Sequence, residues 1–407
     1  MIQANSSVDL RRAGYYSLSD VTALLGKSED SVRGELTKLD IRVATQFGME
    51  AVAESDVRKL MSSGKRALNG ISSAKQPGYS LPRLRTLIHR AIAETGLDLK
   101  NTSVLTEAAS GAYIVTPIIA AVAGATHVHA LAKPSRYGSV AEVAALVGEL
   151  ATFCDVADRI TVVEKLTPEI LQSTDLVTNS GHLRPLNAAF IDQLPSHAVI
   201  ALMFEAWEFR PSDIDLDACL RRNIPVVGVN EHHPAVDVFS FLGPLCVRQL
   251  HDCGFSVYRN RVAVLCDNGF AEPVCRGLSA GGADVQLFQT ALEVPCENWD
   301  AIVVALQPAL EARVGELEAR HLAAIAPPGV PLLQFWGDID RKAVHEHGME
   351  IWPPVAPSSG HMGILLSAIG PEPIVRLQTG GLRAAEWIMR GGTDTQDGFS
   401  QLVEPPQ

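Results

Sequence analysis

Residues 261–288, RVAVLCDNGFAEPVCRGLSAGGADVQLF, decide the fold of this 407-residue chain. An apolar, β-branched run at 262–266 is followed by a turn with one Gly, and a helical stretch then leads to a second apolar run at 284–288. Short apolar runs that alternate with helices are typical of parallel sheets covered by helices on both faces. The stretch therefore predicts a strand, turn, helix and strand of an α/β protein.

The same alternation extends in both directions from this stretch. Upstream strands are expected at 104–107, 127–132, 161–164, 176–179, 199–204 and 225–229, and downstream strands at 301–305, 331–335 and 349–351. Residues 236–258 are expected to form a long connecting helix, and a helix after Pro357 is expected to return to the first lobe. We therefore predict two Rossmann-like parallel-sheet lobes, 101–243 on the substrate side and 244–357 on the cofactor side, with a returning helix and tail over 358–407.

Composition narrows the classes of function. Hydrophobic residues make up 47% of the chain and charged residues 20%, which suffices for a full core in each lobe. The net charge of −12 disfavours nucleic-acid and membrane-surface binding, and no apolar stretch is long enough to span a bilayer. The seven Cys form no C-x-x-C pair, and the N-terminus has no apolar signal-peptide run. We therefore expect a cytoplasmic protein with free thiols.

The N-terminal part differs from the rest in charge. Residues 1–75 hold 11 Lys and Arg against 9 Asp and Glu, whereas the remainder holds 23 against 37. Two short amphipathic helices and a hairpin with Gly48 are expected within 15–61, so 1–62 resembles the winged helix-turn-helix of excisionase and MerR-type proteins. Glu29, Asp30 and Glu35 on its second helix would repel a phosphate backbone, so we expect packing or dimerisation rather than DNA binding. Residues 63–100 are expected to be a linker and a helix.

The layout of two lobes and a returning helix resembles that of the D-2-hydroxyacid dehydrogenases and adenosylhomocysteinase. In that family the second lobe binds a dinucleotide through G-x-G-x-x-G, which here corresponds to DNGFAE at 267–272 with only Gly269 retained. Asp267 and Glu272 would place negative charge beside a diphosphate. Gln289 stands where an acidic residue would bind the ribose hydroxyls.

These departures affect the predicted cofactor. S-adenosylmethionine has no diphosphate and is slightly preferred, and NAD(P) is the alternative. A lobe that has lost its cofactor and only closes the cleft is also compatible with the departures. The residues expected to line the cofactor pocket are Asp267, Asn268, Gly269, Gln289 and Trp336.

Polar residues that follow the predicted strands are the candidate site, because parallel sheets bind ligands beyond the carboxyl ends of their strands. The expected substrate-binding residues are Glu107, Tyr113, Lys133, Arg136, Tyr137, Asn179 and Asn230. The expected acid–base residues, chosen because His and desolvated carboxylates titrate near neutral pH, are His182, Glu205, Glu208, His232 and His361. No spaced metal-ligand motif is present, so no metal is expected.

Three hypotheses of function follow. The preferred one is a biosynthetic enzyme that acts on a small polar metabolite in an inter-lobe cleft, by transfer from S-adenosylmethionine or, alternatively, as an NAD(P)-dependent oxidoreductase. The second is a ligand-sensing DNA-binding regulator, and the third a non-catalytic scaffold. A homodimer is expected because the N-terminal unit and the returning helix offer apolar faces.

Overall fold

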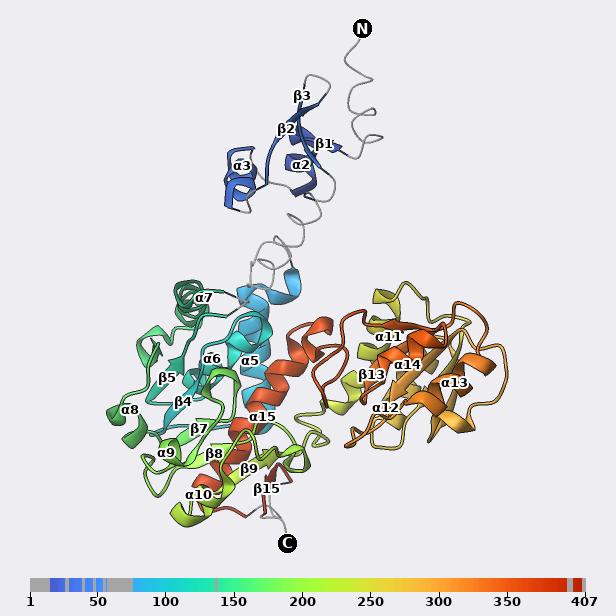
Figure 1. Ribbon diagram of the computed structural model, residues 1–407. Helices are drawn as coiled ribbons and strands as arrows, with labels where there is room; N and C mark the ends of the chain where they lie inside the picture. The colour runs from blue at the N-terminus through green and yellow to red at the C-terminus, as the bar shows by residue number, and fades with distance from the viewer. Residues whose placement is uncertain are drawn as a thin grey trace.

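The computed structural model describes residues 15–25, 29–38, 41–46, 49–53, 56, 76–135, 138–393 and 398–404 (Figure 1). They form a small N-terminal unit and two parallel-sheet lobes, so the predicted α/β class with two Rossmann-like lobes is confirmed. Within these ranges, no helix is both long and apolar enough to cross a membrane.

The N-terminal unit contains the helices and hairpin that the sequence predicts. Its elements are β1 (Tyr15–Ser17), α2 (Leu18–Leu25), α3 (Glu29–Lys38), β2 (Ala44–Gln46) and β3 (Met49–Ala53). The strands pair antiparallel in the order β1-β3-β2, and Val21, Leu36 and Val52 are buried between sheet and helices. Of the last predicted helix, Asp56 is helical and the residues after it lie outside the described ranges.

The first lobe is built on a seven-stranded sheet in the order β15-β9-β8-β7-β4-β5-β6. Its strands are β4 (Ser103–Glu107), β5 (His127–Leu131), β6 (Ile160–Val163), β7 (Leu176–Thr178), β8 (Val199–Ala201), β9 (Val226–Val229) and β15 (Ser400–Leu402). Without β15, this is the 3-2-1-4-5-6 order of dinucleotide-binding sheets, with its switch point between β4 and β7. β15 pairs antiparallel with β9 and was not predicted.

Helices cover both faces of the first sheet. They are α5 (Leu81–Thr95), α6 (Val115–Val122), α7 (Val140–Phe153), α8 (Pro168–Gln172), α9 (Ala188–Ile191), α10 (Leu216–Arg222) and α15 (Glu372–Met389). Successive residues of a strand point to opposite faces, so Val104 joins the core on one side of the sheet and Leu105 the core on the other.

The second lobe has a five-stranded parallel sheet in the order β11-β10-β12-β13-β14. Its strands are β10 (Arg261–Leu265), β11 (Asp284–Phe288), β12 (Ala301–Ala305), β13 (Pro331–Trp336) and β14 (Glu350–Trp352), and its helices are α11 (Leu242–Asp252), α12 (Ala271–Ala280), α13 (Glu316–Ile325) and α14 (Arg341–Glu346). This is the 2-1-3-4-5 order, whose switch point lies between β10 and β12. The two lobes therefore have different topologies.

Two sequence predictions about the connections were wrong. The expected helix over 236–258 is shorter, because α11 begins only at Leu242 and ends at Asp252. The turn at 358–363 does not open the returning helix, since α15 begins at Glu372 after a loop and a short 3-10 turn. As predicted, α15 packs on the first lobe, where Ile374, Leu382 and Ala385 join the core (Figure 1).

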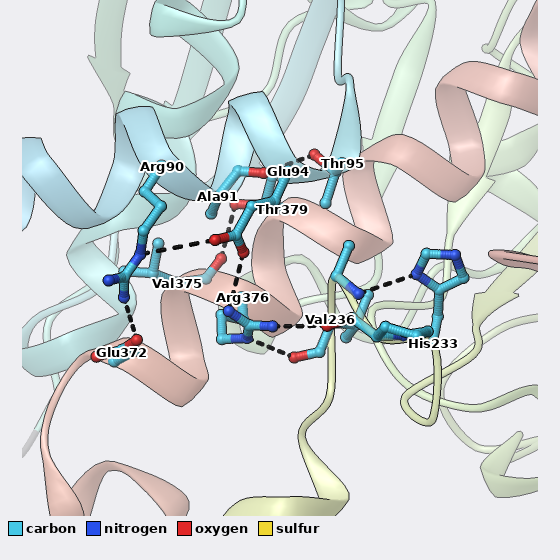
Figure 2. Close-up of polar contacts among 12 residues, drawn as sticks. Arg90, Ala91, Glu94, Thr95, His233, Val236, Glu372, Val375, Arg376 and Thr379 are labelled. Carbon is cyan, nitrogen blue, oxygen red and sulfur yellow. Dashed lines mark hydrogen bonds and ion pairs between the residues drawn. The ribbon is translucent and has the colours of Figure 1, made fainter.

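Arg376 of α15 fixes the segment through which the chain leaves the first lobe (Figure 2). Its guanidinium donates to the carbonyl oxygens of Pro234 and Val236, at 2.8 Å each, and pairs with Glu94 of α5 at 3.0 Å. Each carbonyl is satisfied by a charged donor, so the segment after β9 is held against α15. The residues at the end of β9 therefore keep a fixed position.

Candidate functional site

Glu205 connects the polar residues at the ends of β8 and β9. It is only 4% exposed, and its carboxylate accepts hydrogen bonds from the backbone N–H of Glu231 at 2.7 Å and from Nε2 of Gln401 at 2.8 Å. Its backbone oxygen accepts from the N–H of Glu208 at 3.1 Å. Glu205, predicted as an acid–base residue, thus positions two further carboxyl groups.

Glu231 is buried and Glu208 is half-buried, and their charges act on each other. Burial, opposed by Arg210 and reinforced by Glu205, raises the pKa of Glu208 to about 7. Burial, together with the charges of Glu208 and Glu205, raises the pKa of Glu231 well above its ordinary value. Two like charges in a desolvated site resist simultaneous ionisation, so one proton is retained near neutral pH. The pair can therefore both accept and donate a proton.

Tyr113 places a phenol beside these carboxyl groups. It follows β4, and although the residue as a whole is 37% exposed, desolvation of its hydroxyl raises its pKa to about 12, with Glu107 and Glu231 adding to the effect. The hydroxyl therefore stays protonated near neutral pH and can donate a hydrogen bond. The charges of Glu107, after β4, and of Glu231, after β9, therefore both act on the Tyr113 hydroxyl.

Two guanidinium groups border the carboxyl groups. Arg184 donates to the side-chain and backbone oxygens of Asn179 and pairs with Asp213 at 3.4 Å, while burial lowers its pKa. Arg210 forms no ion pair within 4 Å with any carboxylate of the described residues. A cation without a carboxylate partner is suited to hold an anionic group of a ligand. Asn179 is fully buried, and its Nδ2 has no hydrogen-bond partner among the described residues.

The second lobe reaches this site through an aromatic ring and an imidazole. Trp207 of the first lobe and Trp336 of the second lie edge to face with centroids 6.1 Å apart. Arg210 donates to Nε2 of His361 at 3.4 Å, while Nδ1 of His361 lies 3.0 Å from the carbonyl of Ser359. Residues of the two lobes thus meet at Trp207 and Trp336 and at Arg210 and His361.

A groove of about 760 Å³ opens beside the same loop. Trp207, Phe209 and Leu402 contribute apolar surface to it, and Asn187 and Asp215 contribute polar groups. Ligand sites for small molecules are commonly of this size. The groove lies on the first lobe alone, and Glu208 and Arg210 do not line it.

The switch point of the first lobe is spanned by a carboxylate. Oε2 of Glu107, at the end of β4, accepts from the backbone N–H of His182 at 2.9 Å, and Nζ of Lys133 donates to the carbonyl of His182 at 3.1 Å. A Cβ on Gly181 would lie 1.8 Å from the same oxygen, so a larger residue there would displace the Glu107 carboxylate. Lys133, Glu107 and His182 are thus brought together as predicted, with the backbone of His182 making the contacts.

The switch point of the second lobe is also spanned by a carboxylate. Asp267 accepts from the backbone N–H of Gln307 at 2.8 Å, from Nδ2 of Asn268 at 3.1 Å, and from Arg313 at 2.8 Å. Burial alone would raise its pKa, but these hydrogen bonds and the Arg313 charge outweigh burial and lower it. Asp267 is therefore ionised at neutral pH.

The second lobe does not fit the diphosphate of an NAD-type cofactor. Asp267 already takes the backbone N–H and the guanidinium that would bind a phosphate oxygen. A second anion 4 Å from it would be repelled by about 4 kcal/mol at an effective dielectric constant of 20. Asn268 and Gly269 line this closed turn, and Trp336 instead stacks on Phe270 with centroids 4.5 Å apart.

Several predicted site residues have other contacts. Asn230 donates to the carbonyl of Gly398 and accepts from the N–H of His232, so it shapes the turn after β9. The ring of His232 stacks on that of Phe239 with centroids 3.7 Å apart, so His232 packs within the segment that connects the two lobes. Gln289 lies exposed at the end of β11. Arg136 and Tyr137 lie outside the described residues.

Sequence reasoning missed Glu231, Arg184 and Arg313. Glu231 lies in the polar segment after β9 that the sequence singled out, and its place directly after a buried strand was the available signal. Arg184 and Arg313 carry no such signal, because the groups they pair with, Asp213 and Asp267, lie 29 and 46 positions away in the sequence.

No protein-family model and no curated protein matches this chain. Solved structures do resemble it. A dipicolinate synthase component of Bacillus halodurans aligns with 72% of this chain and 98% of its own, at a TM-score of 0.47 and 12% identity. A dipicolinate synthase chain from Bacillus subtilis aligns with 73% of this chain and 99% of its own, at a TM-score of 0.48 and 11% sequence identity. An NAD-dependent formate dehydrogenase of Staphylococcus aureus, in complex with NAD, aligns with 60% of this chain and 89% of its own, at a TM-score of 0.40 and 14% sequence identity.

These likenesses concern the fold. The predicted layout of two Rossmann-like parallel-sheet lobes is confirmed by the strand orders of the two sheets themselves. The preference for S-adenosylmethionine and the NAD(P) alternative both stay predictions. The helix-turn-helix resemblance of the N-terminal unit and the homodimer stay predictions.

Proposed function

We propose that this chain is an enzyme that moves a proton on a small, anionic carbonyl compound bound between the lobes. The observation that carries the proposal is the Glu208–Glu231 pair, a half-buried and a buried carboxyl group after two adjacent strands, with the pKa of both raised. Shifted pKa values in a site that also holds a phenol and a guanidinium without a carboxylate partner among the described residues are characteristic of acid–base catalysis.

The proposed roles follow from the charge each group carries. Glu208, with a pKa of about 7, is ionised in part at neutral pH and takes the proton from the carbon beside the carbonyl. Glu231 stays protonated and donates its proton to the carbonyl oxygen as negative charge develops there, which leaves the enol. Tyr113 donates a hydrogen bond to the same oxygen. Neutral donors aimed at a developing oxyanion in a desolvated site are an effective form of catalysis.

The remaining residues would bind and orient the substrate. Arg210 would hold a carboxylate of the substrate, because its charge acts on Glu208 and it has no carboxylate partner within the described ranges. Nδ2 of Asn179, a buried donor without a partner in the same ranges, would donate to a further substrate oxygen. Trp207 and Trp336 would exclude water as the lobes approach one another.

Exchange of substrate hydrogen for solvent deuterium tests this proposal. A panel of 2-oxo and 3-oxo carboxylic acids is incubated with the protein in D₂O, and loss of the C–H signal beside the carbonyl is followed by proton NMR. Wild-type protein should accelerate exchange for at least one compound, and Glu208→Gln should slow that exchange by at least about 100-fold, since it removes the base. Glu272→Gln, an exposed second-lobe substitution, is the matched control and should exchange at the wild-type rate. Exchange by Glu208→Gln at the wild-type rate would contradict the proposal.

An NAD(P)-dependent oxidoreductase is the second candidate. The observation that favours it is the 3-2-1-4-5-6 strand order of the first lobe, which would place the dinucleotide near Lys133 rather than in the second lobe. Titration with NADH and NADPH, followed by tryptophan fluorescence, tests it. Saturable quenching that weakens in Lys133→Ala supports this candidate, and the absence of quenching removes it.

The DNA-binding hypothesis has less support. Arg33, a cation of the second N-terminal helix, is paired with both Glu29 and Glu50, so its charge is neutralised within the unit. A DNA-reading helix needs free cations to contact phosphates. A gel shift at low salt with genomic DNA tests this hypothesis, and we expect no retained fragments.

A further inference from the structure

The switch point of the second lobe has the donors of an anion site. In a sheet of this order, phosphate groups bind beyond the first strand, at the start of the helix that follows. Here that helix is α12, and the backbone N–H of its N-cap, Phe270, donates to Oδ1 of Asn268 at 3.0 Å. The backbone N–H of Gln307, after the neighbouring β12, and the guanidinium of Arg313 point to the same position.

Asp267 occupies this position with its own negative charge. One carboxylate oxygen accepts from Gln307 and Asn268, and the other accepts from Arg313. Arg313 is itself oriented by a second bond, at 2.7 Å, to the carbonyl of Gln307. The Asp267 and Arg313 side chains are each 25% exposed, so the pair lies partly within the protein. Backbone amide and guanidinium are also the donors that bind a phosphate.

We propose that Asp267 is a built-in anion that fills the phosphate position of the second lobe, so that this lobe takes no diphosphate-containing ligand. The chain's own carboxylate then keeps the turn after β10 ordered, a role that a bound cofactor would otherwise have. The lobe serves to close the cleft over the first lobe, through Trp336 and His361. This inference does not rest on proton transfer by Glu208.

Unmasking the anion site tests the proposal. Wild-type protein, Asp267→Ala and Asp267→Asn are titrated with sodium pyrophosphate by isothermal titration calorimetry at pH 7.5 and constant ionic strength. We expect Asp267→Ala to bind pyrophosphate at least tenfold more tightly than wild type, because Arg313 and the Gln307 N–H become free. Asp267→Asn keeps the shape of the side chain and should show a gain of at least threefold, so it carries the test if Asp267→Ala does not fold.

Two controls locate the effect. Asp284→Ala removes a different carboxylate of the same lobe, one that pairs with Arg261 at 3.3 Å, and should bind pyrophosphate as weakly as wild type. Arg313→Ala combined with Asp267→Asn should lose the gain. The proposal is overturned if neither Asp267 variant binds pyrophosphate more tightly than wild type. It is also overturned if wild type binds pyrophosphate saturably and Arg313→Ala abolishes that binding.

Discussion

The carboxyl groups at the strand ends of the two lobes are in opposite electrostatic states. In the second lobe, Asp267 is surrounded by donors and a guanidinium, and its pKa is lowered. In the first lobe, half-buried Glu208 and buried Glu231 act on each other, and the pKa values of both are raised. The same kind of side chain, at equivalent ends of parallel sheets, is thus neutralised by a cation in one lobe and by a proton in the other.

The difference bears on the proposed division of roles between the lobes. A carboxylate whose hydrogen bonds are all satisfied stabilises its loop and has no proton to exchange near neutral pH. A carboxyl group whose pKa is raised to near 7 destabilises the folded protein once it ionises. Such destabilising groups are concentrated at functional sites. Under the proposed function, proton transfer belongs to the first lobe, and the second lobe covers the site through Trp336 and His361.

The largest stability effect is expected for Glu208→Gln. The folded-state pKa of Glu208 is about 7 against an ordinary value of 4.5, so the folded protein retains a proton that the unfolded chain releases. The contribution of Glu208 to the free energy of unfolding is therefore fully present below pH 4.5 and is lost as the pH rises through 7. The lost contribution is about 3 kcal/mol. Glutamine resembles the protonated form, so the variant should match wild type at pH 4.5 and exceed it by about 3 kcal/mol at pH 8.

Urea unfolding at pH 4.5 and pH 8 measures this difference. The account is weakened if Glu208→Gln is less stable than wild type at pH 8, because the carboxylate would then be stabilised by contacts rather than destabilised by burial. Glu272→Gln, on the exposed face of α12, serves as the control and should change stability by less than about 0.5 kcal/mol at either pH.

Asp267→Asn should show a smaller effect of the opposite sign. Because the folded-state pKa of Asp267 is lowered, its contribution is present above pH 3.8 and is lost as the pH falls through the folded-state value. At pH 7 the variant should lose about 1 kcal/mol, a value reduced by the partial exposure of the pair with Arg313. Urea unfolding at pH 7 and pH 3 checks this. An equal loss at both values would show that charge is not responsible.

The smallest effect is expected at the contact between the lobes. His361→Ala removes a 3.4 Å hydrogen bond from Arg210 at an exposed site, so the free energy of unfolding should change by less than about 0.5 kcal/mol. The same urea experiment at pH 7 measures it. A loss above about 1.5 kcal/mol would show that the lobes depend on this contact for stability, and the comparison of two separable lobes would need revision.

The sequence was sufficient to predict the strands because each is a short apolar run between helices, as at 262–266 and 301–305. It could not show β15, since a three-residue edge strand held by Gln401 has no such run. The sequence could not predict the strand order either. The orders 3-2-1-4-5-6 in the first lobe and 2-1-3-4-5 in the second depend on which strands pair, and the local sequence pattern does not encode strand pairing.

The candidate site was predictable in part for the same reason. Strand ends could be read from the sequence, so Glu205, Glu208 and Lys133 were found. Their roles could not, because the pKa of Glu208 depends on burial in a place where another strand brings Glu231 beside it. Asp267 was recognised as a charge that conflicts with a diphosphate, but its partner Arg313 could be found only in the folded structure.

Carbon-13 NMR titration of the glutamate side-chain carboxyl groups tests the central claim most directly. In protein labelled at the glutamate δ carbon, one carboxyl signal should titrate near pH 7 and be absent in Glu208→Gln, while a second should stay protonated at neutral pH and be absent in Glu231→Gln. If all glutamate carboxyl groups titrate below about pH 5.5, the first lobe holds no acid–base pair, and the account is contradicted.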